Sequence, residues 1–183
     1  MRILAIDPGI SGALAFYLKS PLHVSGLQLV CDMPLISGDI NPHQLHAIIR
    51  QQRPDLAIIE RVHPHPKEGV SSVWRFAAAY TVACTVVRLQ EIPIMLVTPA
   101  KWKKAMGVKG GPEGKEQCRL LAIDMFPTCQ ELFKLKRHHN RAEAVLLAAY
   151  AAQHSGVRNY ETNRSDREED GTMVNSKATP GKL

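Results

Sequence analysis

The sequence predicts an α/β fold: a mixed five-stranded sheet in which three antiparallel strands precede alternating helices and strands, with helices on its flanks. Three observations support this prediction. Short apolar runs separated by tight turns open the chain, as expected for an antiparallel meander. A later apolar run, 55–62, is nearly continuous, which is typical of a strand buried on both faces. Beyond it, segments with helical spacing of apolar residues flank one more short apolar run.

Four of the expected strands lie in the first part of the chain. In order, they span 2–7, 13–18, 27–33 and 55–62. A Pro-Gly turn at 8–12 joins the first two strands. Between the third and fourth strands, Asn41 is placed to cap a helix whose first position is Pro42, and Arg53-Pro54 ends that helix.

The remainder of the chain predicts helices around one further strand. In order, these are a long and mostly buried helix at 71–90, a strand at 93–98, a short basic helix opening at 99–104, and helices at 115–126 and 140–154. Trp74 and Trp102 are both expected to pack inside this domain, which spans 1–156. Residues 157–183 contain few apolar side chains, so we expect a disordered polar tail there.

Length and composition narrow the class of protein. A chain of 183 residues is long enough for one well-packed domain and short for two. No apolar stretch approaches the roughly 20 residues that cross a bilayer, and the chain opens in strand pattern without a signal-peptide core. The four cysteines form no C-x-x-C pair, which argues against a zinc ribbon or a disulfide framework. We therefore expect a reduced, cytoplasmic protein with no membrane partner.

The net charge of +6 is concentrated in one segment. Residues 101–141 carry ten Lys or Arg against four Asp or Glu, whereas the tail is balanced. A local basic excess indicates a binding surface for a polyanion, although a solvated face is the simpler alternative. The same segment contains a glycine-rich turn at 107–115, where the backbone could approach a phosphate closely. This combination favours nucleic-acid binding.

Three acidic residues stand at informative places. Asp7 ends the first strand, Glu60 ends the fourth apolar run, and Glu143 lies near the start of the last helix. A carboxylate at the end of an apolar strand is costly unless its charge meets a partner or a metal. Two such strands and a helix that brings a third carboxylate therefore predict a divalent-metal site.

Structural roles could also explain these acids. Asp7 and Glu60 could cap neighbouring loops at the strand ends. Asn140 and Glu143 have the spacing of a capping box, in which Asn140 caps the helix and Glu143 reaches back to its N–H group. For Glu143 the capping and metal-binding roles could coexist.

The order of these elements and motifs resembles RuvC-type Holliday-junction resolvases. The resemblance is carried by Ile3-Leu4-Ala5-Ile6-Asp7-Pro8-Gly9, by the strand ending at Glu60 and by Ala142-Glu143-Ala144 in the last helix, and it covers 1–155. The run Gly69-Val70-Ser71-Ser72 looks like the phage-associated branch of that family. The resemblance implies a ribonuclease-H-like fold and a bacterial or phage-infected cytoplasm.

The resemblance also implies a mechanism. Phosphodiester hydrolysis would use two Mg²⁺ ions, or Mn²⁺, roughly 4 Å apart, one activating water and one stabilising the leaving oxygen. Asp7 would bridge both ions, while Glu60 and Glu143 would each hold one. Lys115 is assigned a place near the scissile phosphate.

A fourth site position departs from the family pattern. Bacterial resolvases usually have an acid three residues before the last one, and Asn140 occupies that position here. His139 lies four residues before Glu143 on the same helical face and could bind metal or act as a general base. We favour His139, with Asn140 as the helix cap, while Asn140 stays open as the alternative ligand.

DNA contacts are expected on the basic elements and on the loop after Glu60. The basic candidates are Lys101, Lys103, Lys104, Lys109, Lys115, Arg119, Lys134, Lys136, Arg137 and Arg141. They would bind phosphate without reading sequence. The loop at 63–72 contributes Ser71, Ser72 and His65, and His65 or Trp74 could stack on a base at the open centre of the junction.

A four-way junction is two-fold symmetric, so the resemblance implies a homodimer with two active sites. The helix at 71–90 is apolar on more than one face and could pack against its own copy, the alternative being a fully buried central helix. Two other functions stay open. The chain could be a junction-binding protein with weakened catalysis, because Asn140 replaces an acid. Its Asp-Pro-Gly turn also occurs in actin-like phosphotransferases, although a second domain would not fit.

Overall fold

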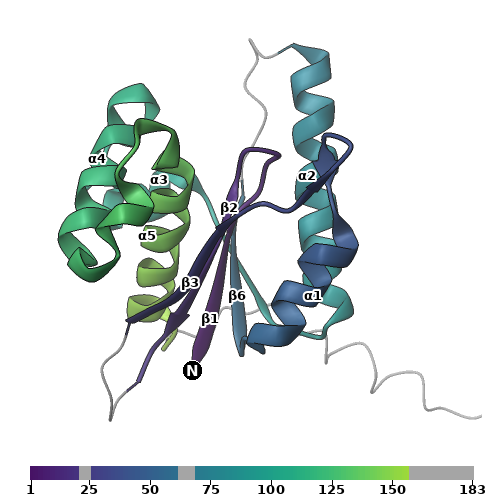
Figure 1. Ribbon diagram of the computed structural model, residues 1–183, viewed down its shortest axis with the longest axis horizontal. Helices are drawn as coiled ribbons and strands as arrows, with labels where there is room; N and C mark the ends of the chain where they lie inside the picture. The colour runs from purple at the N-terminus through teal and green to yellow at the C-terminus, as the bar shows by residue number, and fades with distance from the viewer. Residues whose placement is uncertain (21–25, 62–68, 157–183) are drawn as a thin grey trace, which may run out of the picture.

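A computed structural model describes residues 1–20, 26–61 and 69–156 (Figure 1). The expected disordered tail at 157–183 and the expected DNA contact His65 lie outside these ranges. The main sheet contains five strands: β1 Arg2–Asp7, β2 Ala13–Leu18, β3 Gly26–Asp32, β6 Leu56–Glu60 and β7 Ile94–Val97. Each predicted strand is therefore confirmed to within two residues of its expected bounds.

The sheet is mixed, as predicted. Its strand order is β3-β2-β1-β6-β7. The pairs β1–β2 and β2–β3 are antiparallel, and β1–β6 and β6–β7 are parallel. β6 lies inside the sheet and is buried along its whole length, which explains its nearly continuous apolar sequence. A separate two-stranded ribbon is formed by β4 Leu35–Ile36 and β5 Asp39–Ile40.

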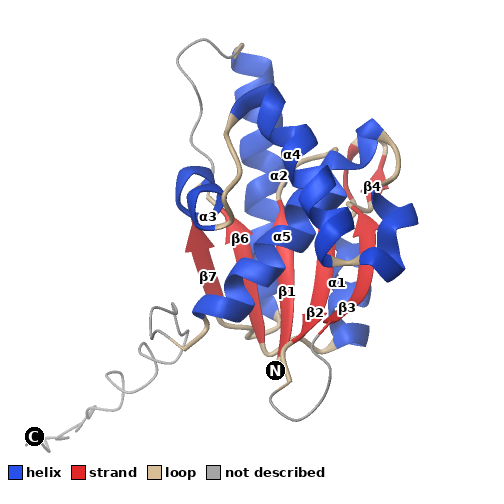
Figure 2. Cartoon of the chain, turned by 90° about the vertical axis from the view of Figure 1, so that its left-hand side faces the viewer, coloured by secondary structure: helices blue, strands red, loops and turns tan. Residues whose placement is uncertain are grey.

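Helices cover both faces of the sheet, in three layers. Figure 1 shows α1 (Pro42–Gln52) and α2 (Val70–Leu89) on one face, with α3 (Pro99–Ala105), α4 (Gly111–Met125) and α5 (His139–His154) on the other. Two short 3₁₀ helices, η1 Pro127–Phe133 and η2 Lys136–His138, connect α4 to α5. Figure 2 shows α5 crossing the middle of the sheet. The four cysteines are not disulfide-bonded.

Each face of the sheet carries its own core, because successive strand residues point to opposite sides. On β1, Ile3 and Ala5 join the core beneath α5, whereas Leu4 and Ile6 join the core beneath α1 and α2. The same alternation places Ile58 of β6 beneath α5. Residues an even number of positions from Ile3 on β1, or from Ile58 on β6, therefore face α5.

The helix α1 confirms the expected capping. The side chain of Asn41 accepts a hydrogen bond from the backbone N–H of Gln44 at 3.1 Å, and Pro42 follows the cap. Arg53 ends the helix in the left-handed region, with φ of 47°. These local signals sufficed because each involves neighbours in the chain.

The glycine-rich segment differs from the prediction. A turn was expected through 115, but α4 already begins at Gly111. Gly114 lies within its first turns, where an added Cβ would sit 1.9 Å from the carbonyl oxygen of Lys109. This glycine permits close backbone packing inside the protein, so it does not present a free loop to a phosphate.

The long helix α2 is much less buried than predicted. Its buried residues begin only at Ala79 and pack on the sheet: Ala79, Ala83, Cys84, Val86 and Val87. The N-terminal half projects past the carboxyl ends of β1 and β6 (Figure 1), where Val70 is 86% and Trp74 is 75% exposed. The expectation that Trp74 is packed is therefore wrong, and so is the alternative of a fully buried central helix.

The composition of α2 also corrects an expectation about membranes. By length and composition, this helix is apolar enough to span a bilayer, although no stretch was expected to approach that length. Its C-terminal half packs against the sheet in the same core as α1. A single helix of this kind is weak evidence for a membrane span.

Candidate active site

Asp7 and Glu60 are brought side by side by the pairing of two parallel strands. In the register of β1 and β6, Ile6 lies opposite Ile59, and each of the two acids is the next residue along its strand. Asp7 lies an even number of residues after Ile3, and Glu60 an even number after Ile58. Both side chains therefore emerge on the face beneath α5. The carboxyl ends of adjacent parallel strands thus place two carboxylates together.

The helix α5 contributes Glu143, which is 9% exposed. Two polar contacts hold the start of this helix against the sheet. The side-chain amide of Asn140 donates to the backbone carbonyl of Ser11, in the turn after Asp7. Arg141 binds Asp32 at the end of β3 through two hydrogen bonds of 2.6 Å.

These contacts correct the predicted capping box. The helix begins at His139, one residue earlier than expected, and its N-cap is His138 without a side-chain cap. Asn140 lies inside the first turn and bonds across to Ser11, so it is not the cap. Glu143 does not reach back to the start of its own helix: its Oε1 accepts a hydrogen bond from Lys103.

The short helix α3 bonds to two of the three acids through consecutive residues. The indole Nε1 of Trp102 donates to Oε1 of Glu60 at 2.7 Å. The ammonium Nζ of Lys103 lies 3.1 Å from Oε1 of Glu143. Trp102 is 1% exposed and the Lys103 side chain 13%, so both contacts are shielded from water. Because α3 begins two residues after β7, the sheet itself positions this helix over Glu60.

The clustered carboxylates perturb one another electrostatically. Burial raises the pKa of Asp7 well above its usual range, and the nearby charges of Glu60 and Glu143 raise that pKa further. Burial also raises the pKa of Glu60, against the hydrogen bond from Trp102, which lowers it. Burial alone would lower the pKa of Lys103, but its attraction to Glu143 outweighs this effect and leaves that pKa raised. Negative charge therefore dominates the site, with Lys103 as the nearest counter-charge.

The donor chemistry of this cluster fits a hard divalent cation. Carboxylate oxygens are the ligands that Mg²⁺ and Mn²⁺ prefer, and a cation would relieve the repulsion that raises the pKa of Asp7. Burial raises the pKa of the adjacent Cys118 thiol to about 12, so this thiol stays neutral. Within residues 1–20, 26–61 and 69–156, however, no three His, Cys, Asp or Glu side chains are arranged as a ligand set. Glu143 would have to exchange Lys103 for a metal.

Solved Holliday-junction resolvases share this architecture. RuvC of Thermus thermophilus, in complex with Holliday junction substrate, matches with a TM-score of 0.56 and 16% sequence identity, over 84% of this chain and 96% of RuvC. The chain has the RuvC fold. Another Thermus thermophilus RuvC structure gives a TM-score of 0.57 at 16% identity, over 85% of this chain and 97% of that one.

A eukaryotic structure matches as well. The yeast mitochondrial Holliday junction resolvase Ydc2 gives a TM-score of 0.52 at 13% identity, over 83% of this chain and 78% of that protein. No protein-family model and no curated protein matches the sequence. The ribonuclease-H-like α/β class expected from the sequence is confirmed by these structures, while the phage-associated branch stays a prediction.

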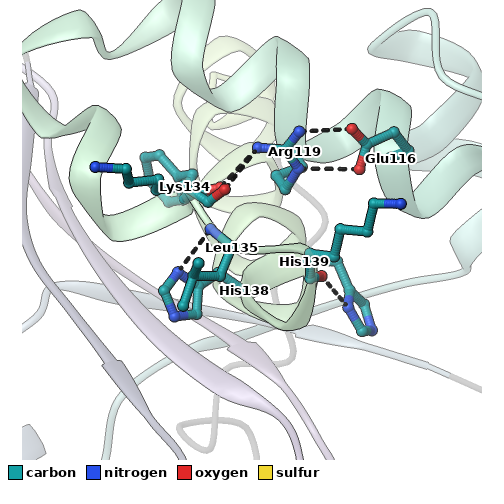
Figure 3. A network of polar contacts seen from close by, with 8 residues as sticks. Glu116, Arg119, Lys134, Leu135, His138 and His139 are labelled. Atoms are coloured by element: carbon teal, nitrogen blue, oxygen red, sulfur yellow. Dashed lines mark hydrogen bonds and ion pairs between the residues drawn. The ribbon is translucent and has the colours of Figure 1, made fainter.

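On this RuvC fold, the predicted fourth position lies at the start of α5. His139 is half-buried, and its Nδ1 is 3.0 Å from the backbone carbonyl of Lys136 (Figure 3). Because a carbonyl only accepts hydrogen bonds, Nδ1 carries the proton of this contact, which leaves Nε2 as the other ring nitrogen. That nitrogen is the one with which His139 could bind a metal or accept a proton.

The residues of this chain that were expected to contact DNA divide into two groups. Some are engaged within the protein: Arg119 binds Glu116 at 2.5 and 2.9 Å and the carbonyls of Phe133 and Lys134 (Figure 3). Arg141 is held by Asp32, while Lys109 pairs with Glu113 at 2.8 Å and Lys134 pairs with Glu131 at 3.3 Å. The members of the second group are exposed to solvent: Lys101, Lys104, Lys115, Lys136, Arg137, Ser71 and Ser72. Only the second group presents side chains freely to a polyanion.

Sequence reasoning missed the roles of α3 in this site. Trp102 was expected as a core residue, and it is buried, but its indole also holds Glu60. Lys103 was expected on a DNA-binding surface, yet it lies against Glu143. The signal that could have found them is the short connection at Thr98, which joins α3 to the strand beside Glu60.

Proposed function

We propose that this protein is a metal-dependent, structure-selective endodeoxyribonuclease that resolves four-way DNA junctions by paired symmetric nicks. The observation that carries the proposal is the pairing of Asp7 with Glu60 at adjacent strand ends, with Glu143 close enough to raise the pKa of Asp7. The fold adds support, because RuvC with this fold has been solved with a Holliday junction substrate. The proposed setting is a bacterial or phage-infected cytoplasm.

The proposed cofactor is Mg²⁺ or Mn²⁺, two ions per site, held by Asp7, Glu60 and Glu143. When bound, such ions make a water nucleophilic near neutral pH and stabilise the leaving oxygen. The protein's own groups would orient the reaction. His139 would accept a proton at Nε2, and Lys115, whose charge already lowers the pKa of Asp7, would lie near the scissile phosphate.

The exposed basic side chains on α3, α4 and η2 support the proposed DNA contacts. They would bind the backbone of a duplex arm through charge, without reading bases. Junction affinity should therefore fall steeply with added salt, because several phosphates release counterions. The exposed N-terminal half of α2 supports the proposed homodimer, since a two-fold junction requires two sites related by a two-fold axis.

A gel assay with synthetic DNA tests the proposal. The purified protein is incubated with a four-way junction or with a linear duplex of the same sequence, in Mg²⁺, in Mn²⁺ or in EDTA. We expect symmetric nicks in the junction only, and only with metal. Asp7→Asn and Glu60→Gln are expected to abolish nicking while junction affinity is retained.

Two results would contradict the proposal. Nicking that persists in Asp7→Asn would place the chemistry elsewhere. A junction that is bound but left intact with either metal would favour the second candidate, a junction-binding protein with weakened catalysis. That candidate is favoured by the ion pair between Lys103 and Glu143, and by Asn140 in place of an acid. An actin-like phosphotransferase receives no support, because the described residues form one α/β unit around a single main sheet.

A further inference from the structure

We propose that Trp102 is a positioning residue that sets the places of both Glu60 and Glu143. The inference rests on the proposed function and names a residue of that same site. One indole contacts the two acids in two ways: its N–H edge binds Glu60 directly, and its face lies against the lysine that binds Glu143.

The edge of the indole determines the orientation of Glu60. Nε1 donates to Oε1 at 2.7 Å, and this hydrogen bond is buried. A glutamate side chain has several rotatable bonds, so an unheld carboxylate samples many positions. With Oε1 bound to Trp102, the carboxylate is held in one place and keeps Oε2 for a cation. Partners of this kind orient metal-binding carboxylates in proteins.

The face of the indole steadies the link to Glu143. The Nζ atom of Lys103 lies 5.2 Å from the centre of the Trp102 ring, within the range of a cation–π contact. The same Nζ lies 3.1 Å from Oε1 of Glu143. The ring thus helps to hold the ammonium at Glu143, and removing it frees both Lys103 and the acid.

Trp102 is itself rigidly placed, which a positioning residue requires. It is 1% exposed and belongs to the core formed by β1, β6 and α5. Its backbone N–H donates to the carbonyl of Thr98, and β7, the strand just before Thr98, pairs with β6 so that Val97 lies opposite Glu60. The sheet register therefore fixes the distance between the indole and the carboxylate it binds.

A replacement that changes only the N–H group tests this inference. β-(3-Benzothienyl)alanine is incorporated at position 102 alone, through a reassigned stop codon, so that Trp74 keeps its natural side chain. This analogue keeps the shape of the indole and puts sulfur where the N–H group lies. Mn²⁺ affinity is measured by electron paramagnetic resonance of the free ion, and melting temperature and junction affinity in EDTA are measured on the same samples.

We expect the analogue to weaken Mn²⁺ binding by about tenfold to a hundredfold, as is usual when an outer-shell partner is lost. Junction affinity in EDTA should stay unchanged, and kcat for nicking should fall without a matching rise in KM. Trp102→Leu also removes the ring face that helps to hold Lys103 at Glu143, the contact that a metal must displace, so its Mn²⁺ affinity should not fall below that of the analogue. The natural protein, prepared in parallel, is the reference for Mn²⁺ affinity, kcat and melting temperature.

The outcomes separate this inference from the proposed function. If the natural protein binds Mn²⁺ and nicks junctions, and the analogue has the same Mn²⁺ affinity and kcat, the positioning role of Trp102 is overturned alone. If the natural protein binds no Mn²⁺, the proposed function fails, and the inference fails with it. A loss of Mn²⁺ affinity at an unchanged melting temperature supports the inference, because a purely structural role would lower the melting temperature as well.

Discussion

Single residues in the candidate site are arranged at a cost to stability. Asp7 is half-buried next to two further carboxylates, and its pKa is raised by loss of solvent first and by Glu60 and Glu143 next. Isolated like charges in a shielded site destabilise a fold. Such an arrangement is typical of sites whose charges serve a function, and it makes the stability of the metal-free protein depend on pH in a defined direction.

The first prediction concerns that dependence. The folded-state pKa of Asp7 lies above its unfolded value, so between the two values only the folded state keeps the proton. Stability from this group is present below the unfolded pKa and is lost as pH rises through the folded pKa. In EDTA, the Asp7→Asn variant should therefore be more stable than the natural protein at neutral pH. The gain in the free energy of unfolding should be about 1.4 kcal/mol for each unit by which the pKa of Asp7 is higher in the folded than in the unfolded state.

This gain should shrink as pH falls and vanish below the unfolded pKa of Asp7. Urea unfolding of both proteins across a pH series measures the difference. Comparing the two proteins cancels the pH-dependent stability that other groups contribute. One such group is Asp32, whose pKa shifts in the opposite direction because it accepts hydrogen bonds from Arg141. A gain that is constant with pH would show that the carboxylate of Asp7 is not electrostatically strained.

The second prediction separates the two candidates for the fourth site position. His139→Ala should reduce nicking by about a hundredfold or more, since general acid–base groups typically contribute 10²–10⁴. Its melting temperature should barely change, because the ring makes one exposed hydrogen bond. Asn140→Ala removes the bond to Ser11 and should cost about 1 kcal/mol of stability while nicking falls only severalfold. Nicking assays and thermal melts on both variants decide between them. Normal nicking by His139→Ala with loss in Asn140→Ala would reverse the assignment.

Among the elements, the turn between β1 and β2 governs where Asp7 lies. Gly12 passes so close to that strand end that an added Cβ would sit 2.0 Å from the carbonyl oxygen of Asp7. The Gly12 carbonyl also accepts a hydrogen bond from the N–H of Met33. The turn thus joins the strand end that carries Asp7 to the segment after β3.

The third prediction follows from this close approach. Gly12→Ala should lower the free energy of unfolding by about 1–3 kcal/mol, because the backbone must move to admit the methyl group. It should also impair nicking, since the backbone that moves carries Asp7. Gly26→Ala is the matched control: among residues 1–20, 26–61 and 69–156, nothing lies within 4 Å of the added Cβ, so its stability should change little. Equal effects in the two variants, measured by urea unfolding, would contradict the role of the turn.

Viewed as a whole, the molecule exposes apolar surface at one end. The N-terminal half of α2, which covers the face opposite α5, extends with Val70 and Trp74 exposed past the same end of the sheet where the candidate site lies (Figure 1). Large exposed apolar groups are typical of interaction surfaces. A two-fold assembly through this helix would place two sites on one junction.

The fourth prediction tests that assembly. Trp74→Asp should shift the protein from dimer to monomer in light scattering coupled to gel filtration, with the melting temperature of the fold nearly unchanged. Leu89→Asp provides the control, because Leu89 is also 75% exposed but lies at the opposite end of α2. A natural protein that is already monomeric, or a Trp74→Asp variant that stays dimeric, would show that α2 is not the interface.

Patterns along the chain were enough to predict the strands, the helix α1 with its caps, and the positions of Asp7 and Glu60 at strand ends. These features depend on neighbours in the chain: alternation along a strand, a cap next to its helix, a glycine in its turn. The order of elements then sufficed for the fold class and for placing Glu143 on a helix across the sheet. The exposure of the N-terminal half of α2 could not be predicted, because an apolar helix has the same sequence pattern whether or not other elements cover it.

The partner that each charged or polar group binds depends on how the elements pack in the folded protein. Three contacts in the site depend on distances between elements that are remote in sequence. They are the ion pair of Lys103 with Glu143, the hydrogen bond from Trp102 to Glu60, and the hydrogen bond from Asn140 to Ser11. Such contacts are set by how α3 and α5 pack on the sheet, and local propensity carries no information about that packing. The chain therefore determined which acids could form a site, and the packing of two helices decided which partners hold them.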